Sequence, residues 1–332
     1  MTPPDTYSPP PLMHNGHDQT IFPTLFRKIN TRVYSRERIA TADDDFLDLD
    51  WSTVGRRRLA IISHGLEGDS RRPYVKGMVR ALNRSGWDCL AWNFRGCSGE
   101  INRRLKFYHS GSYDDLDTVI SHAAARGRYN EIALVGFSIG GNITLLYLGK
   151  HRDKVHPLVS CAAALSVPCD LASSAGVLAR PANRIYMQHF LRLLHGKIKA
   201  KMAVMPQRLD DAGYAELKNF ADFDDRYTAP LNGFRDAADY WQQCSSKPWL
   251  TKIAIPTLMI SARNDPFLAP ECFPEREAAA NANLFLETPA YGGHVGFVKF
   301  SRDGLYWSER RIAAFFDRRS RMDRPAGCRP AK

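Results

Sequence analysis

Apolar runs of strand length alternate with segments of helical apolar spacing along most of this 332-residue chain. Short runs rich in β-branched residues are typical of buried strands, and apolar residues three or four positions apart indicate helices. We therefore expect strands at 46–51, 58–63, 87–93, 131–137, 158–167, 254–261 and 284–287, and helices at 74–85, 114–126, 142–150 and 305–318. This alternation predicts an α/β fold with a mostly parallel sheet flanked by helices on both faces.

One stretch, 169–246, interrupts the alternation. It contains no convincing core strand, and its apolar and aromatic residues follow helical spacing. We interpret it as a mainly helical cap inserted between two strands of the sheet. The predicted organisation is a flexible N-terminal segment at 1–16, an α/β core at 17–168 and 247–317 that includes an apolar arm at 19–26, the cap at 169–246, and a basic C-terminal tail at 318–332.

Within the cap, one predicted helix combines an apolar stripe with basic residues. The stripe is formed by Met187, Leu191, Leu194, Ile198 and Met202, and the residues available for the other faces are Arg184, Arg192, Lys199 and Lys201. Gly196 is expected to break or bend the helix. The helix is either a lid packed on the core with a solvated basic face, or a lid that also rests on an anionic membrane. Both interpretations predict an apolar substrate pocket.

The composition, 44% hydrophobic and 24% charged residues, is typical of a globular protein and excludes disordered, collagen-like and coiled-coil chains. No apolar run is long enough to span a membrane, and the N-terminus has neither a basic leader nor an apolar core. The seven cysteines form no C-x-x-C pair, unlike those of a disulfide framework or a zinc ribbon. We expect reduced thiols and a cytoplasmic protein.

The formal net charge is +11, from 46 basic and 35 acidic residues, and two basic clusters stand out, one in the cap helix and one in the tail. No helix-turn-helix, RNP or zinc-finger pattern accompanies this charge, so we expect no nucleic-acid partner. Peripheral contact with an anionic membrane stays open as an alternative. No partner protein is implied.

The residues Gly136-Phe137-Ser138-Ile139-Gly140 match the G-x-S-x-G pattern between a predicted strand and a predicted helix. An abrupt strand-to-helix turn strains its central residue and requires neighbours without side chains. Ser138 is therefore the candidate nucleophile. The alternative is an ordinary glycine-rich turn in which Ser138 caps the helix.

A serine nucleophile needs a base, and in this architecture the acid and then the histidine follow the serine. Of the histidines far enough downstream, His189 and His195 fall in the cap, which leaves His294 in a glycine-rich loop. The predicted acid is Asp265, just after the strand that ends at Ser261, whereas Asp236 and Asp239 are excluded by their place in the cap. A turn-forming Asp before Pro266 is the alternative for Asp265.

An oxyanion hole needs two backbone donors. We predict the N–H of Ile139, after the nucleophile, and that of Leu66 in the loop His64–Gly68. His64 precedes the serine and is interpreted as structural. Four further polar residues, Arg95, Tyr108, His109 and Asp115, are interpreted as scaffold, and Cys97 as a packed thiol rather than a nucleophile.

Together these segments resemble the YheT-like α/β-hydrolase family from about His17 to Phe316. The segments are HGLEG at 64–68, NFRGCSGE at 93–100, YHSGSYDDL at 108–116, GFSIGGN at 136–142, SVPCDL at 166–171, FDDRYTAPLNGF at 223–234, NDPF at 264–267 and GGHVGF at 292–297. The resemblance implies the α/β-hydrolase fold and a serine hydrolase of carboxylic esters, with some relatives acting on lipid esters. Ser138, Asp265 and His294 match the family's triad. Membrane-anchored relatives carry an N-terminal spanning helix that this sequence lacks, and Asn264 stands where relatives often have Asp.

The sequence thus predicts a serine esterase that works through an acyl-enzyme and needs no cofactor or metal. Two alternatives remain. The same acyl-enzyme could transfer its acyl group to an alcohol, amine or thiol, or the chain could be a non-catalytic binding protein on this fold.

Overall fold

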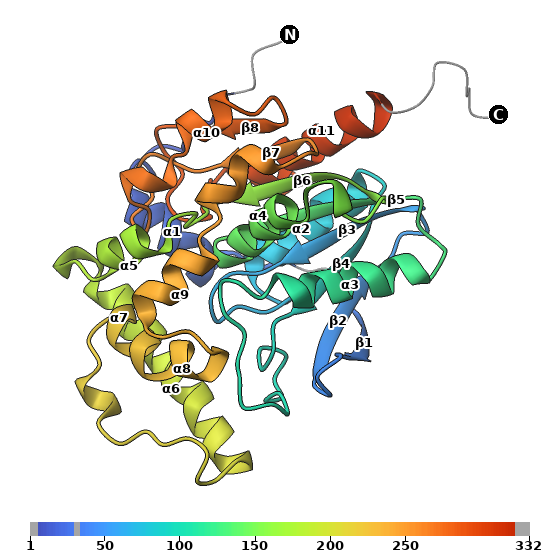
Figure 1. Ribbon diagram of the computed structural model, residues 1–332. Coiled ribbons are helices and arrows are strands. Elements are labelled where there is room, and N and C mark those ends of the chain that lie inside the picture. Colours follow the sequence, from blue (N-terminus) through green and yellow to red (C-terminus); the bar gives the residue numbers. More distant parts are fainter. Residues whose placement is uncertain (1–5, 30–33, 323–332) are drawn as a thin grey trace.

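The computed structural model describes residues 6–29 and 34–322, which are organised around one eight-stranded sheet (Figure 1). In chain order the strands are β1 (Ser35–Ala40), β2 (Phe46–Ser52), β3 (Arg58–Ser63), β4 (Asp88–Asn93), β5 (Glu131–Phe137), β6 (Val159–Leu165), β7 (Thr257–Ile260) and β8 (Leu284–Glu287). Their order across the sheet is β1-β2-β4-β3-β5-β6-β7-β8. β2 pairs antiparallel with β1 and β4, and every other pairing is parallel. The predicted α/β fold with a mostly parallel sheet is confirmed.

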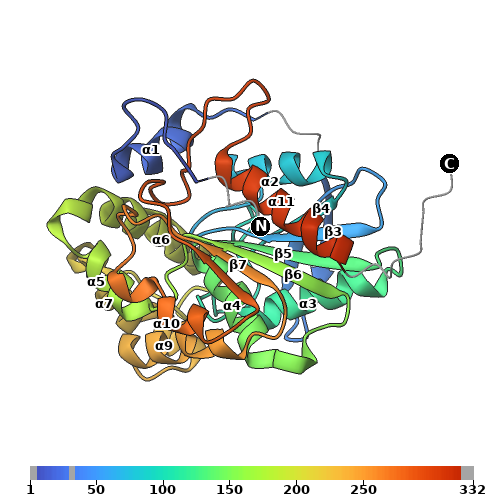
Figure 2. The same ribbon diagram turned by 90° about the horizontal axis from the view of Figure 1, so that it is seen from above.

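Helices cover both faces of this sheet (Figure 2). On one face lie α2 (Pro73–Arg84) and α11 (Trp307–Met322), and on the other α3 (Tyr113–Ala125) and α4 (Ile139–His151). Alternate residues of a strand point to opposite faces. In β3, Leu59 and Ile61 accordingly pack in the cluster with α3 and α4, whereas Ala60 and Ile62 pack in the cluster with α2 and α11. A strand buried on both sides is a continuous apolar run, which is why β3 and β5 are readable in the sequence.

Two elements near the N-terminus differ from expectation. The apolar arm is part of a helix, α1 (Gly16–Phe26), and β1 had no strand signal because only Ile39 and Ala40 of its six residues are apolar. Ion pairs hold β1 at the sheet edge, where Arg36 contacts Asp50 and Arg38 contacts Asp48. Such side-chain pairing between adjacent strands depends on register and has no periodicity along the chain.

Both ends of the chain also differ from expectation where the structure describes them. Tyr7, in the segment predicted to be flexible, is buried and donates a hydrogen bond to Gln19 Oε1. α11 continues to Met322, beyond the predicted end at Arg318, and the rest of the predicted basic tail, 323–332, lies outside the described residues. No helix within 6–29 and 34–322 is both long and apolar enough to cross a membrane.

Residues 169–246, here called the cap segment, connect β6 to β7 and contain helices but no strand. They gather beyond one end of the sheet, apart from the helices that flank it (Figure 1). The helices are α5 (Leu171–Leu178), α6 (Arg184–Val204), α7 (Phe220–Phe223), α8 (Ala229–Asn232) and α9 (Ala237–Cys244), and α10 (Glu275–Ala279) follows after β7.

The longest cap helix, α6, is continuous through Gly196, so the predicted break does not occur. Its apolar stripe is turned inward, as Leu191 and Ile198 are buried. Lys201 is also fully buried, which makes its expected place on an outer face wrong. Its ammonium group donates to the carbonyl oxygens of Asn102 and Arg104, and these acceptors replace the water that it gives up.

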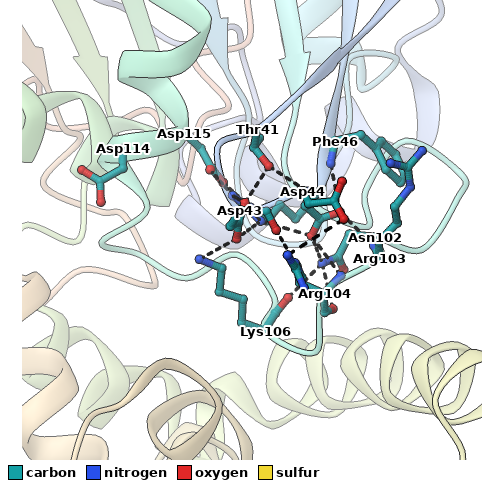
Figure 3. A network of polar contacts seen from close by, with 12 residues as sticks. Thr41, Asp43, Asp44, Phe46, Asn102, Arg103, Arg104, Lys106, Asp114 and Asp115 are labelled. Carbon is teal, nitrogen blue, oxygen red and sulfur yellow. Dashed lines mark hydrogen bonds and ion pairs between the residues drawn. The ribbon is translucent and has the colours of Figure 1, made fainter.

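A polar network joins the loop after β4 to the segment between β1 and β2 (Figure 3). The Arg95 guanidinium is buried and donates to both carboxylate oxygens of Asp115, at 2.7 and 2.8 Å. It also lies 2.9 Å from Asp43 and 3.1 Å from Asp45. Burial opposes ionisation of Asp43, but hydrogen bonds led by that from Arg95 hold its pKa below the ordinary value. These contacts fit the interpretation of Arg95 and Asp115 as scaffold.

Replacing Arg95 with Met should destabilise the protein by about 3–5 kcal/mol, because buried carboxylates would lose their cation. Urea unfolding of the variant and the parent measures the change. The matched control is Arg263→Met, since Arg263 pairs with Glu275 at an exposed position and should contribute at most about 1 kcal/mol. Equal losses in the two variants would contradict the structural role of Arg95.

A buried carboxyl group in the cap segment, that of Asp224, has a pKa raised above its ordinary value, the opposite of the shift at Asp43. Asp224 Oδ2 accepts a 2.8 Å hydrogen bond from Trp241 Nε1. Burial raises the pKa of Asp224 to about 6, although the hydrogen bonds from Thr228 and Trp241 oppose the shift. The folded protein therefore retains a proton on Asp224 over a pH range in which the unfolded chain has released it.

The raised pKa predicts that Asp224 lowers the free energy of unfolding as pH rises from about 4 to about 6. Below this pH range the carboxyl is protonated in both the folded and the unfolded protein. Above it, the whole decrease in the free energy of unfolding has occurred. Asp224→Asn keeps an oxygen that can accept the hydrogen bond from Trp241. Its amide does not titrate, so it adds no pH dependence to the free energy of unfolding. Its stability relative to the parent should improve by about 2–3 kcal/mol between pH 4 and pH 7, measured by urea unfolding. A pH-independent difference would contradict the prediction.

Candidate active site

Ser138 occupies the single position between the end of β5 and the start of α4. Its backbone has φ 53° and ψ −121°, a strained conformation for a residue with a side chain. The turn also requires the two glycines around it. A Cβ on Gly136 would lie 2.4 Å from the carbonyl oxygen of Gly140, and a Cβ on Gly140 would lie 2.3 Å from that of His64. The turn thus packs directly on the chain after β3 and presents Ser138 at the carboxyl end of the sheet.

Ser138, His294 and Asp265 form a continuous chain of polar contacts. His294 Nε2 lies 3.0 Å from Ser138 Oγ, and His294 Nδ1 lies 2.9 Å from Asp265 Oδ2. The Asp265 side chain is completely buried, and its Oδ1 also accepts the backbone N–H of Phe267 at 2.9 Å. With the ring proton on Nδ1 donated to the carboxylate, Nε2 is left as an acceptor for the serine hydroxyl. Three residues from distant parts of the sequence are thus assembled at the carboxyl ends of parallel strands.

The His294 loop is held by side chains that sequence reasoning missed. The backbone N–H of His294 donates to Thr20 Oγ1 at 2.9 Å, and that of Val295 donates to Ser166 Oγ at 2.9 Å. Thr20 lies on α1, 274 residues before the histidine. No pattern along the chain marks this contact, because it exists only once α1 packs on the loop.

Asn264, noted in the sequence only as a departure from the relatives' pattern, bridges the acid loop to two other segments. Its Oδ1 accepts the N–H of Gly293 at 3.0 Å, and its Nδ2 donates to the carbonyl oxygen of His14 at 2.9 Å. A carboxylate at this position could accept the first bond but not donate the second. The amide therefore fits the loop geometry of this chain.

The loop after β3 faces the serine from the other side. In the described part of the chain, the amides of Leu66 and Ile139 donate to no protein acceptor, and Ile139 is the first residue of α4, where an amide has no intrahelical partner. Leu66, Ile139, Ser138 and His294 all line the same cavity. The two predicted oxyanion donors are thus near the serine and available.

His64 is buried, and both nitrogens of its ring have polar partners. Nδ1 lies 2.8 Å from the carbonyl oxygen of Gly65, and Nε2 accepts the N–H of Phe94 at 3.1 Å. Burial lowers the pKa of His64 to about 3, so the ring is neutral at physiological pH. These contacts fit the interpretation of His64 as structural.

A buried charged cluster connects the same loop to the cap segment. Lys197 Nζ on α6 lies 2.7 Å from Glu67 Oε1 and 3.0 Å from Cys97 Sγ. The Tyr108 hydroxyl donates to Glu67 Oε1 and accepts the backbone N–H of Glu67. Burial raises the pKa of Cys97 to about 11, which keeps it a protonated, packed thiol. Sequence reasoning did not single out Glu67 or Lys197 for this site.

The cavity at this site has a volume of about 130 Å³ and lies between the sheet edge and the cap segment. Its walls are mostly apolar and include Leu178 and Leu194 from the cap segment and Leu268 from the core. For comparison, a cavity of roughly 150 Å³ holds a benzene ring. Among the described residues, no group of three or more His, Cys, Asp or Glu side chains is placed to bind a metal ion.

Comparisons with known proteins agree with this architecture. A family model described as the alpha/beta hydrolase fold matches residues 61–300. The chain is 35% identical over 291 residues to the Escherichia coli protein named "Putative esterase YheT", covering 86% of this chain and 84% of that one. It is 28% identical over 305 residues to the mouse "Phospholipase ABHD3", covering 89% and 74%.

Among solved structures, a Pyrococcus furiosus esterase aligns with a TM-score of 0.60 at 16% identity, covering 94% of this chain and all of that one. This likeness supports the fold, since its sequence identity is too low to carry further inference. The family model and the E. coli relative both span most of the chain. The protein therefore belongs to the α/β-hydrolase family, as one of its YheT-like members.

Proposed function

We propose that this protein hydrolyses carboxylic esters through an acyl-enzyme formed on Ser138. The observation that carries the proposal is the chain of contacts from Ser138 Oγ through the His294 ring to Asp265, which opens on an apolar cavity. Relatives named as an esterase, phospholipases and a monoacylglycerol lipase support an ester-hydrolysing reaction.

In the first half of the reaction, Ser138 Oγ attacks the ester carbonyl carbon while His294 Nε2 accepts the hydroxyl proton. The negative charge that develops on the carbonyl oxygen is stabilised by the N–H groups of Leu66 and Ile139. Collapse of the tetrahedral intermediate breaks the bond to the alcohol, which leaves with the proton from His294. Asp265 keeps the ring oriented and stabilises its positive charge.

In the second half, water takes the place of the alcohol. His294 accepts a proton from the water, whose oxygen attacks the acyl carbon, and the same two amides stabilise the second oxyanion. The carboxylic acid is released when His294 returns the proton to Ser138. Ser138 Oγ and His294 Nε2, which exchange the first proton, already lie 3.0 Å apart, and the proposed steps use no cofactor.

Ser138→Ala should abolish covalent labelling by a fluorophosphonate and lower p-nitrophenyl ester turnover by at least about 10³-fold, because the nucleophile is removed. Gel-based labelling and steady-state kinetics measure the two effects. Ser174→Ala, at a serine that lines the same cavity, is the matched control and should retain labelling. Undiminished labelling of Ser138→Ala would refute the proposed role of Ser138.

The apolar cavity predicts that kcat/KM rises from acetyl to medium-chain acyl esters, since each buried methylene adds favourable transfer free energy. A series of p-nitrophenyl esters measures this dependence. Leu194→Trp, which fills part of the cavity, should shift the preference back towards short chains. Activity confined to acetyl esters in the parent would contradict an acyl-binding role for the cavity.

Mass spectrometry of the products distinguishes hydrolysis, which releases the free acid, from transfer of the acyl group to another acceptor.

A further inference from the structure

Most of the exposed large apolar side chains of the described residues lie in two neighbouring segments. Of eight such side chains, six are in the N-terminal segment and in residues 291–300: Leu12, Ile21, Leu25, Phe26, Tyr291 and Phe300. Figure 2 shows α1 beside the loop that leads from the His294 loop towards α11. Exposed apolar residues are common singly, but a group of them marks a binding surface.

The centre of this group is a contiguous patch. Leu25, Phe26 and Phe300 are 64%, 66% and 66% exposed. The ring of Phe22 joins them, with its centroid 5.1 Å from that of Phe26 and 5.8 Å from that of Phe300. We refer to Ile21, Phe22, Leu25, Phe26 and Phe300 as the α1 patch.

The opposite side of α1 packs on the core. The α1 patch is therefore not the face by which this helix packs on the protein. Gln19 and Pro23 are buried, and Gln19 Oε1 accepts hydrogen bonds from the Tyr7 hydroxyl and from the N–H of Val298. Thr20 holds the His294 loop. The polar side chains of Gln19 and Thr20 therefore help to fix the helix on the core, while three of its large apolar side chains, Ile21, Leu25 and Phe26, are exposed, unlike the usual amphipathic arrangement.

Basic side chains flank the α1 patch on one side. A shallow groove lined by Phe22, Phe26 and Phe300 is also lined by Lys28, Arg80, Lys299 and Arg302. Arg27 is in the same groove but forms a buried ion pair with Glu309 at 2.6 Å. The nearby acid Asp303 is engaged by Arg310 and Arg84. An apolar centre with a cationic rim is complementary to a lipid surface that carries anionic headgroups.

We propose that the α1 patch docks on an anionic lipid surface. Its apolar side chains enter the boundary between headgroups and acyl chains, and the cationic rim contacts the headgroup phosphates. His17 on α1 contacts the Tyr186 hydroxyl of α6 at 3.1 Å, so α1 lies between the cap segment and the His294 loop. Docking would thus bring the lipid surface beside the candidate active site. The inference stands on surface chemistry and does not require the proposed function.

The proposed lipid-facing element is therefore the α1 patch and not the cap helix α6. The α6 stripe faces the protein interior, and the basic side chains of Lys197 and Lys201 are buried. The large apolar residues exposed on α6 are Ile185 and Val204, at opposite ends of the helix. They form no patch with each other, and this makes them suitable controls.

The test is co-sedimentation of the full chain with vesicles of phosphatidylglycerol and phosphatidylcholine, or of phosphatidylcholine alone, at low and high salt. The parent should bind the anionic vesicles at low salt and lose binding as salt screens the charges. Leu25→Ser with Phe26→Ser and Phe300→Ser should weaken binding at least about tenfold by removing buried apolar area. Lys28→Glu with Arg302→Glu should weaken it similarly on anionic vesicles only.

The matched control combines Ile185→Ser, Val204→Ser and Lys199→Glu on α6 and should bind like the parent. Ser138→Ala should also bind like the parent, which separates docking from the esterase proposal. The circular dichroism spectra and urea unfolding midpoints of the α1 patch variants should match those of the parent, showing that they fold.

Three outcomes would overturn the proposal. The parent could fail to bind anionic vesicles at low salt, or the α1 patch variants could bind as tightly as the parent. Light scattering could instead show that the parent is an oligomer that the same variants dissociate, which would make the α1 patch a contact between copies of this chain.

Discussion

The packing of the β5–α4 turn against the end of β3 is the constraint on which the candidate site depends. The turn approaches so closely that Gly136 and Gly140 have no space for a side chain, and Ser138 adopts a strained conformation between them. The same contact brings the start of α4 against the loop that holds Leu66, and Ile139 and Leu66 line the same cavity. The candidate nucleophile and the two candidate oxyanion donors are thus positioned by backbone geometry, which leaves only the candidate histidine and acid to be supplied by later strands.

Buried charged clusters hold the loops and the cap segment to this framework. Arg95 connects the loop after β4 to three carboxylates, Lys201 donates to that loop from α6, and Lys197 connects α6 to Glu67 in the candidate oxyanion loop. Burying ions costs free energy that their attraction only partly returns. Their directional contacts, however, admit one arrangement of cap and loop, whereas an apolar contact tolerates sliding. We infer that these clusters specify where the cap segment sits over the cavity.

The N-terminal helix connects the candidate site to the protein surface. Its inward side chains hold the His294 loop through Thr20, and its outward side chains form the α1 patch. A substrate with an apolar acyl group is concentrated in membranes and lipid aggregates rather than in water. A docking surface beside the cavity and an apolar cavity wall are therefore compatible parts of one proposal, although each rests on its own observations.

The sequence by itself determined the α/β fold and proposed the Ser138, His294 and Asp265 set, because buried parallel strands leave continuous apolar runs and a strained turn requires glycines at fixed spacing. It did not reveal β1, the roles of Thr20 and Asn264, or the burial of Lys197 and Lys201. β1 depends on ion pairs formed in register with β2, and the other features depend on partners far away in the chain. Thr20 contacts His294 across 274 positions, and Lys201 donates to the carbonyl oxygen of Asn102, 99 positions before it. Local patterns record what a residue needs from its neighbours in sequence, and only the tertiary structure decides which distant group satisfies a buried charge or an open amide.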